Sequence, residues 1–379
     1  MDNEDTYGSQ TTTTRDNQLM SLQSILKLLA AMLTTVTASA FAHSPHFDIA
    51  IVRSGKSFAF PILNSHDRVA TRINRLLQLS ELQSLGKGRS RRIFDQARVD
   101  DGSIYGGKVW MMSSIYTNNR RVLSLGFDES SCGMTCTYWH RYHTFNPANG
   151  DRISLQDLFT KTGYEKFFKL ITDRRSSKYR REVHRKVEAE DQESFLGTIG
   201  CFENDDLSDF YLVERDIVID GENCLIKSQK FDGLKMYVKI RLPEFRSFLN
   251  NYGRSVFGLS ASTLAKFPSH RLPQLFEGSI DGSLPIALVL NSEFELGIRG
   301  IYAYLRQGEG IGLEGDLIDG QMKITEYVLE PRTTMKVYGP TRNYIENGQV
   351  SAAFDGQRLE GTWTDKDNNR NLSIVAARP

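Results

Sequence analysis

Two cysteines and two histidines lie within twelve positions, in the stretches CGMTC (132–136) and WHRYH (139–143). Thiolate sulfur and imidazole nitrogen are ligands that zinc prefers in proteins. Paired thiols also act in redox chemistry or join in a disulfide. This segment therefore suits a metal site, a redox site or a structural disulfide. The compartment decides between them, because disulfides persist under oxidising conditions.

Residues 1–42 have the order of a leader followed by a secretory signal peptide. Lys27 precedes an apolar run that begins at Leu28 and ends in the small-residue stretch ASAFA (38–42). This order is typical of signal peptides, and the run is shorter than the ~20 apolar residues of a membrane-spanning helix. Met20 is the predicted start. We expect a mature chain that is periplasmic or secreted and is not an integral membrane protein.

All four cysteines, Cys132, Cys136, Cys201 and Cys224, lie in the predicted exported part. An even number of cysteines in an oxidising compartment favours disulfides over reactive thiols. We predict a bond from Cys132 to Cys136 and a second from Cys201 to Cys224. Crossed pairings stay open, because four cysteines permit three connectivities.

Metal and redox chemistry fit this segment less well. If residues 138–145 form a strand, His140 and His143 point to opposite faces and do not readily share an ion. A redox dithiol usually has two residues between its cysteines at a helix start, whereas CGMTC has three. We therefore expect no metal and no cofactor.

Composition and motifs favour binding over catalysis. The 47 Lys and Arg residues nearly balance the 46 Asp and Glu residues, giving a net charge of +1, which is no nucleic-acid footprint. The chain contains no G-x-S-x-G, H-E-x-x-H or phosphate-loop motif, so the familiar hydrolase, metalloprotease and nucleotide-binding signatures are missing. The acidic residues near His184 lie in a charge-rich helical stretch, which is typical of a solvated face. No catalytic residue is predicted.

Residues 43–254 mix strand and helix patterns, which predicts an α+β domain with an antiparallel sheet. The expected elements are a strand at 58–62, a helix at 67–85, a hairpin of strands 107–116 and 121–128, a strand at 138–145, a helix at 164–190 interrupted near 175–177, strands at 211–220 and 234–241, and a helix at 243–251. Ser154 and Asp157 are spaced as a helix cap.

The remainder of the chain is different in kind. Residues 255–274 are rich in turn formers and predict a linker. In residues 275–379 about eight short alternating segments are bounded by Gly, Asn, Asp or Pro. This pattern predicts a small all-β antiparallel barrel or sandwich.

Residues 56–252 resemble a known family. The resemblance rests on the phrases FAFPILN, ATRINRLL, RVLSLGF, TFNPANGDRISLQDLF and VKIRLPEFRSFL, in this order. They are similar to the RsiV-like extracytoplasmic domain of lysozyme-sensing anti-sigma factors, which also occurs beside some peptidoglycan deacetylase domains. The resemblance implies a domain that binds a lysozyme-type muramidase. The family's usual Gly-Ala-His loop is Gly133-Met134-Thr135 here, so any role of that histidine does not transfer.

The last hundred residues resemble a glycine-rich all-β module of exported bacterial proteins, through IRGIYAY (298–304) and LEGTW (359–363). This resemblance implies an architecture and no activity.

Aromatic residues gather beside the CGMTC loop and are the candidate binding site. The candidate residues are Met134, Thr135, Tyr138, Trp139, Arg141 and Tyr142. Trp, Tyr and Arg anchor many protein interfaces, although alternate residues of a strand must face inward. We expect an exported binding protein whose partner is a lysozyme-type muramidase or a cell-wall glycan.

The alternative is an envelope enzyme or a binder of a glycan or small ligand, with its site in the C-terminal barrel. Such a site predicts a polar pocket lined by residues such as Tyr302, Tyr304, Glu314 and Trp363, because barrel mouths hold small ligands.

Overall fold

The computed structural model describes residues 45–86, 91–98, 107–132, 135–204, 207–225, 234–260, 272–292, 297–330, 334–336, 339–341, 343–367 and 369–379. The predicted leader and signal peptide, residues 261–271 of the predicted linker, and Met134 lie outside these ranges. Residues Pro45–Pro379 form one compact unit. No helix within the described ranges is long and apolar enough to cross a membrane.

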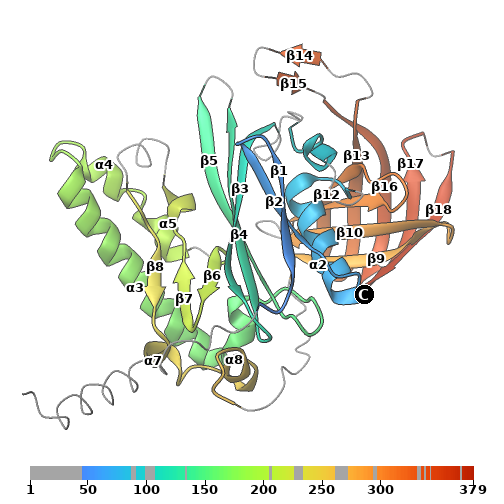
Figure 1. The fold of residues 1–379 in the computed structure, drawn as a ribbon. Helices are drawn as coiled ribbons and strands as arrows, with labels where there is room; N and C mark the ends of the chain where they lie inside the picture. The colour runs from blue at the N-terminus through green and yellow to red at the C-terminus, as the bar shows by residue number, and fades with distance from the viewer. Residues whose placement is uncertain are drawn as a thin grey trace, which may run out of the picture. The chain divides into compact units, whose positions relative to one another are not determined.

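The first part of the chain builds a five-stranded sheet in sequence order (Figure 1). Its strands are β1 (Ile49–Ser54), β2 (Phe58–Leu63), β3 (Lys108–Asn118), β4 (Leu123–Cys132) and β5 (Cys136–Phe145). β3, β4 and β5 pair antiparallel through their turns, which confirms the predicted hairpin and the strand after it. β2 and β3 pair in parallel at a single position.

The helix that follows β2 is buried on two sides. α2 (Arg68–Leu77) begins at Asp67, whose carboxylate accepts a hydrogen bond of 2.7 Å from the backbone of Ala70. It continues as a π-helical turn, η1 (Gln78–Leu82), and ends at Gln83 with a φ of 54°. The predicted helix to residue 85 is therefore shorter and widens in its last turn.

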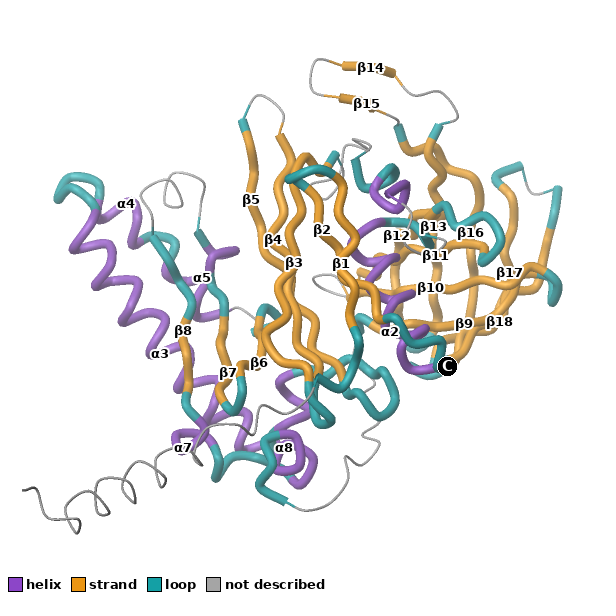
Figure 2. Tube along the Cα trace, in the orientation of Figure 1, coloured by secondary structure: helices purple, strands orange, loops and turns teal. Residues whose placement is uncertain are grey.

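One apolar cluster joins this helix to both of its neighbours. Ile73 and Leu76 of α2 pack in the same cluster as Phe60 and Phe127 of the sheet and as outward-facing barrel residues such as Val289. Figure 2 shows α2 beside β1 and β2 on one side and the barrel strands on the other. Packing between the two neighbours withdraws the apolar side chains of this amphipathic helix from water, and such burial supplies most of a helix's stability.

A second layer lies beside the other face of the sheet. It contains α3 (Lys161–Lys186), the short helices α4 (Gln192–Leu196), α5 (Ile199–Asn204), α7 (Leu242–Phe245) and α8 (Asn251–Val256), and a small sheet of β6 (Phe210–Val213), β7 (Asp216–Ile219) and β8 (Val238–Ile240). The 3₁₀ turns η3 (Leu155–Leu158) and η4 (Glu222–Cys224) connect these elements. Ser154 and Asp157 form the predicted capping box of η3.

Three predictions within this layer are wrong. The predicted helix 243–251 is the four-residue helix α7 followed by a turn, and a separate helix, α8, begins at Asn251. α3 is continuous through residues 175–177, because the Arg175 side chain is buried there with its guanidinium 5.1 Å from the Phe202 ring centroid. The predicted strand 211–220 is a hairpin, β6 and β7, whose turn holds Glu214 at a φ of 54°. Tertiary packing and a left-handed turn residue outweigh the local patterns.

The C-terminal part is a closed antiparallel barrel, as predicted. Its strands are β9 (Gln274–Ile280), β10 (Leu284–Ser292), β11 (Gly297–Tyr304), β12 (Gly310–Ile318), β13 (Gln321–Leu329), β16 (Tyr344–Phe354), β17 (Arg358–Asp365) and β18 (Asn371–Ala377), with a separate pair β14 (Thr334–Lys336) and β15 (Gly339–Thr341). β18 closes the barrel by pairing with β9. A Cβ on Gly361 would lie 2.1 Å from the Ser351 carbonyl oxygen, so only glycine fits this tight curvature.

Both predicted disulfides are present. Cys132 bonds Cys136 across the tip of the β4–β5 hairpin. Cys201 in α5 bonds Cys224 in η4, over a sequence separation of 23 residues. The second bond ties the helical layer to the turn after β7.

A buried ion triad also fastens the barrel's last residues to the first domain. The Asp151 carboxylate lies 2.6 Å from the Arg72 guanidinium and 2.8 Å from that of Arg378, and all three side chains are buried. Arg72 also donates to the backbone oxygens of Asn149 and Pro379. Removing the carboxylate would leave two buried cations facing each other.

We expect Asp151→Ala to lower the free energy of unfolding by roughly 3–5 kcal/mol, since breaking a buried pair leaves its partner uncompensated. Urea denaturation measures this change. The matched control is Glu314→Ala, because Glu314 pairs with Arg299 on the exposed barrel surface and its loss should change stability by less than about 0.5 kcal/mol. Equal effects of the two variants would contradict the structural role of the triad.

The two disulfides should differ in their contributions to stability. The chain-entropy model gives about 3 kcal/mol for a loop the size of that closed by Cys201 and Cys224 and about 2 kcal/mol for a five-residue loop. Replacing Cys201 and Cys224 by Ser should therefore lower the urea midpoint more than replacing Cys132 and Cys136. The opposite order would show that the short disulfide has a larger role than closing its loop.

Candidate functional site

Strand alternation divides the aromatic segment of β5 between the two faces of the sheet. Trp139, Arg141 and His143 point toward the side of η1, where each contacts Glu81 or Glu129. Tyr142 and His140 point to the opposite side, toward η4 and the small sheet. Successive side chains of a strand must diverge in this way, so the six candidate residues do not form one surface.

The side facing η1 holds a buried polar network. The Lys108 ammonium donates to Glu129 at 2.7 Å and to the Glu81 backbone oxygen at 2.6 Å. The indole N–H of Trp139 donates to the other Glu129 oxygen at 2.6 Å. His143 Nε2 lies 2.6 Å from a Glu81 carboxylate oxygen. All five side chains are buried.

The pKa shifts in this network follow from burial and from neighbouring charges. Burial alone would raise the pKa of Glu81, but Arg141, His143 and Lys108 outweigh it and lower that pKa. Burial raises the pKa of Glu129 against the attraction of Lys108. Burial lowers the pKa of His143, which keeps its imidazole neutral. These groups pair with one another beneath the sheet, with only Glu81 Oε2 and His143 Nδ1 lacking a hydrogen bond within the described part of the network, and Trp139 and Arg141 belong to this network.

The opposite face is covered over half of its length by the small sheet. Leu212 of β6 accepts a hydrogen bond of 2.7 Å from Thr117 and donates one of 3.0 Å to Ser124. Tyr142 lies beneath this cover, where its hydroxyl donates to Asp220 at 2.5 Å and its ring stacks on Tyr211 with centroids 4.9 Å apart. Burial raises the pKa of Tyr142, so the phenol stays protonated and is held in the interior.

His140 lies at the edge of the region that the small sheet covers. Its Nδ1 is 2.6 Å from Asp128 of β4 and its Nε2 is 3.1 Å from Glu222 of η4. Burial alone would lower the pKa of His140, but these two hydrogen bonds raise it to about 10. The imidazole is therefore protonated at neutral pH. Its ion pairs with Asp128 and Glu222 join the sheet to the helical layer, and we call these three residues the His140 clasp.

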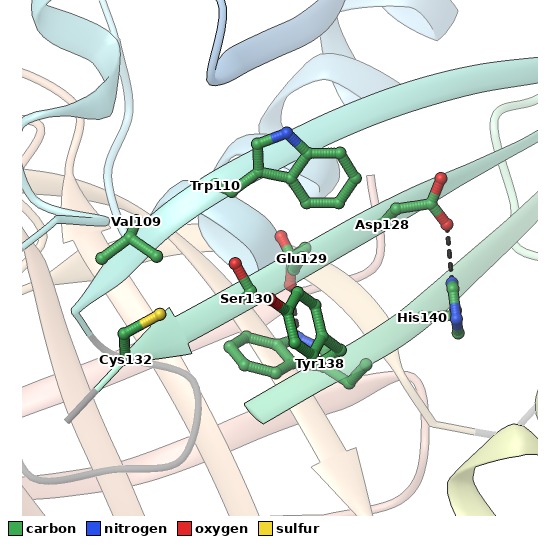
Figure 3. A pocket seen from close by; sticks show the side chains of 9 residues that line it. Val109, Trp110, Asp128, Glu129, Ser130, Cys132, Tyr138 and His140 are labelled. Atoms are coloured by element: carbon green, nitrogen blue, oxygen red, sulfur yellow. Dashed lines mark hydrogen bonds and ion pairs between the residues drawn. The ribbon is translucent and has the colours of Figure 1, made fainter. Parts of the chain in front are cut away.

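The part of this face that no described element covers is a groove of about 620 Å³ (Figure 3). It is lined by Val109, Trp110, Asp128, Glu129, Ser130, Cys132, Tyr138, Trp139 and His140. Trp110, Ser130 and Tyr138 are cross-strand neighbours on β3, β4 and β5. The Asp128–His140 pair stands at one end and Val109 and Cys132 at the other. Tyr138 is 51% exposed, and Val109 is 39% exposed.

The groove contains part of the predicted site. Tyr138 and Trp139 line it, Trp139 as a buried residue of its floor, and Thr135 is exposed at the hairpin tip. Tyr142 bonds Asp220 beneath the small sheet, and Arg141 belongs to the network around Glu81. Met134 lies outside the described residues. The sequence analysis missed Trp110, Asp128 and Glu222. The alternation of residues 107–116 could have placed Trp110 beside Ser130, but no local signal brings Glu222 to His140.

The thiols and imidazoles of the opening motif do not meet at a metal. Cys132 and Cys136 are joined in the disulfide, and His140 and His143 lie on opposite faces, as predicted. Among the described residues, no cluster of His, Cys, Asp and Glu could hold an ion. The charged stretch around His184 is largely exposed on α3, which confirms the prediction of a solvated face.

Three of the four residues named for a barrel site, Tyr302, Tyr304 and Trp363, lie together in the barrel core, where the Tyr302 and Tyr304 ring centroids are 5.6 Å apart, and Glu314 does not join them. Glu314 is exposed and pairs with Arg299 on the outer surface. Tyr302 and Trp363 point inward, and both donate to the buried Glu326 carboxylate, at 2.5 and 2.7 Å. Apolar side chains from all eight barrel strands pack around this carboxylate. This polar cluster lies within a packed core, and the pocket beside Tyr304 measures about 250 Å³. The groove is larger, at about 620 Å³, so we place the candidate site there.

Neither a protein-family model nor a curated protein matches this chain.

The His140 clasp predicts a pH dependence of stability. A histidine in an unfolded chain titrates near ~6.5, and His140 in the fold titrates at about 10. Because the folded state holds the proton more tightly, the stabilisation is fully present below about pH 6.5 and is lost as the pH rises through about 10.

Urea midpoints measured from about pH 6.5 to 10 should therefore fall more steeply for the wild type than for His140→Gln. His66→Gln is the control, because His66 is exposed in the loop before α2, and its profile should follow the wild type. Parallel profiles for all three proteins would contradict a charged clasp.

Proposed function

We propose that the protein is an exported binding protein whose groove face, formed by β3, β4 and β5, binds a cell-wall-associated protein of the lysozyme-type muramidase class. One observation carries the proposal. Among the described residues, no element covers one part of this sheet face, and that part presents Trp110 and Tyr138 beside the disulfide of Cys132 and Cys136. Exposed aromatic residues on a rigid support are typical anchors of protein interfaces.

The state of the nearby titratable groups supports recognition over turnover. His140 is held between two carboxylates, and Glu129 accepts hydrogen bonds from Lys108 and Trp139. A general base needs a free acceptor within reach of the substrate proton. Because these groups are already paired, the groove offers a partner a binding surface and does not offer a free general base.

Two further observations agree with a role outside the cytoplasm. The disulfides join Cys132 to Cys136 and Cys201 to Cys224, and such bonds are typical of oxidising compartments. The resemblance of residues 56–252 to the RsiV-like domain supplies the class of partner. The signal-peptide pattern of residues 20–42 supports export.

Isothermal titration of the purified protein with lysozyme tests the proposal. We expect saturable binding, and we expect Tyr138→Ala to weaken it at least tenfold, about 1.4 kcal/mol, since an exposed aromatic anchor would be lost.

Tyr237→Ala is the matched control, because Tyr237 is 50% exposed, lies just before β8 and is not among the residues that line the groove. It should bind as the wild type does. The absence of binding heat with the wild type, or equal losses in the two variants, would overturn the proposal.

A further inference from the structure

The groove contains a slot between two aromatic side chains. Trp110, Ser130 and Tyr138 lie opposite one another on three adjacent strands. Neighbouring strands are about 4.8 Å apart, so β3 and β5 are separated by roughly 10 Å. Ser130 between them is small and buried. A flat group that contacts a ring on each side needs two layers of van der Waals contact of about 3.5–4.0 Å each, and the separation of the two strands is wide enough for such a group.

The slot also has a negative end. Asp128 and Glu222 both contact the single imidazole of His140, so one carboxylate charge there is not neutralised by His140. None of the nine described residues that line the groove is Lys or Arg. Lys108 is directed beneath the sheet, where it pairs with Glu129 and is almost fully buried. The charge of the slot therefore favours a cation.

We infer that the slot receives an arginine side chain of the protein partner, with the guanidinium between Trp110 and Tyr138 and close to Asp128. This inference rests on the proposed binding function and names the group that the groove recognises. A guanidinium is planar, weakly hydrated and able to stack on aromatic rings while it donates to a carboxylate. A lysine ammonium is compact and strongly hydrated, and a neutral sugar gains nothing from the charge.

The three tryptophans of the chain make the slot directly observable. Trp110 lines the groove, Trp139 is buried beneath it, and Trp363 points into the barrel. In protein labelled with ¹⁵N-tryptophan, each indole N–H gives one signal. Titration with the capped tripeptide Gly-Arg-Gly should move the Trp110 signal saturably and leave the Trp363 signal in place.

Matched probes separate charge from shape. The same tripeptide with citrulline in place of arginine keeps the planar end and removes the charge, and it should bind at least tenfold more weakly, since cation–π attraction and the carboxylate contact are both lost. The lysine tripeptide should also bind more weakly. A chitin-type tetrasaccharide tests the glycan as the occupant. Equal binding of the citrulline and arginine peptides, or a stronger response to the tetrasaccharide, would overturn the inference.

Variants locate the site. Tyr138→Ala removes one wall and retains the Trp110 reporter, so the arginine response should weaken at least fivefold, whereas Tyr138→Phe should restore it by returning the ring. Tyr237→Ala should respond as the wild type does. A response that is unchanged in Tyr138→Ala would place the peptide elsewhere and refute the slot.

The two proposals can fail separately. Binding of lysozyme that depends on Tyr138, without any effect of the arginine peptide on Trp110, would refute the slot and leave the muramidase partner standing. A saturable shift of Trp110 by the arginine peptide, without binding of lysozyme, would establish the slot and refute that partner. A chain that responds to neither ligand would refute both.

Discussion

The period-two alternation of β4 and β5 is the constraint on which the rest of the first domain depends. It sends Glu129 and His143 toward η1 and sends Asp128 and His140 toward η4. A slip of one residue would exchange the two sets and leave buried charges without partners. The disulfide between Cys132 and Cys136 closes the hairpin at the end of this register. The bond therefore fixes which face each functional side chain occupies.

The two faces of the sheet pack against different elements and therefore have different roles. One side meets α2 and η1, which are themselves packed against the barrel, so its polar groups must be satisfied internally. The other side meets the small sheet over only half of its length, and there the cover ends at the clasp of His140. The groove is the part of the sheet that no described element covers. Its position thus follows from the length of β6 and β7, which are four residues each.

Periodicity and composition were sufficient to predict much of this fold. Short alternating segments at regular spacing predicted the barrel, and an even set of cysteines in a chain expected to be exported predicted the disulfides. The break predicted in α3 failed because Arg175 looks solvated from the sequence, whereas Phe202 and Cys224 cover it in the fold. Only the site residues that lie close to the CGMTC motif in sequence could be predicted. Tyr138 and Trp139 stand beside the conspicuous CGMTC motif, but Glu222 is far from His140 in the chain.

The difference between a buried and an exposed aromatic residue explains why this site suits recognition. Trp139 and Tyr142 each place their polar atom on a carboxylate, Glu129 and Asp220, so their rings stiffen the sheet from within. Tyr138, the residue before Trp139 in sequence, remains half exposed. A ring held by such a support loses little conformational freedom on binding, and a partner therefore gains more of the contact energy. Under the proposed binding function, the buried networks would contribute to affinity indirectly, since they hold the strands that present Trp110 and Tyr138.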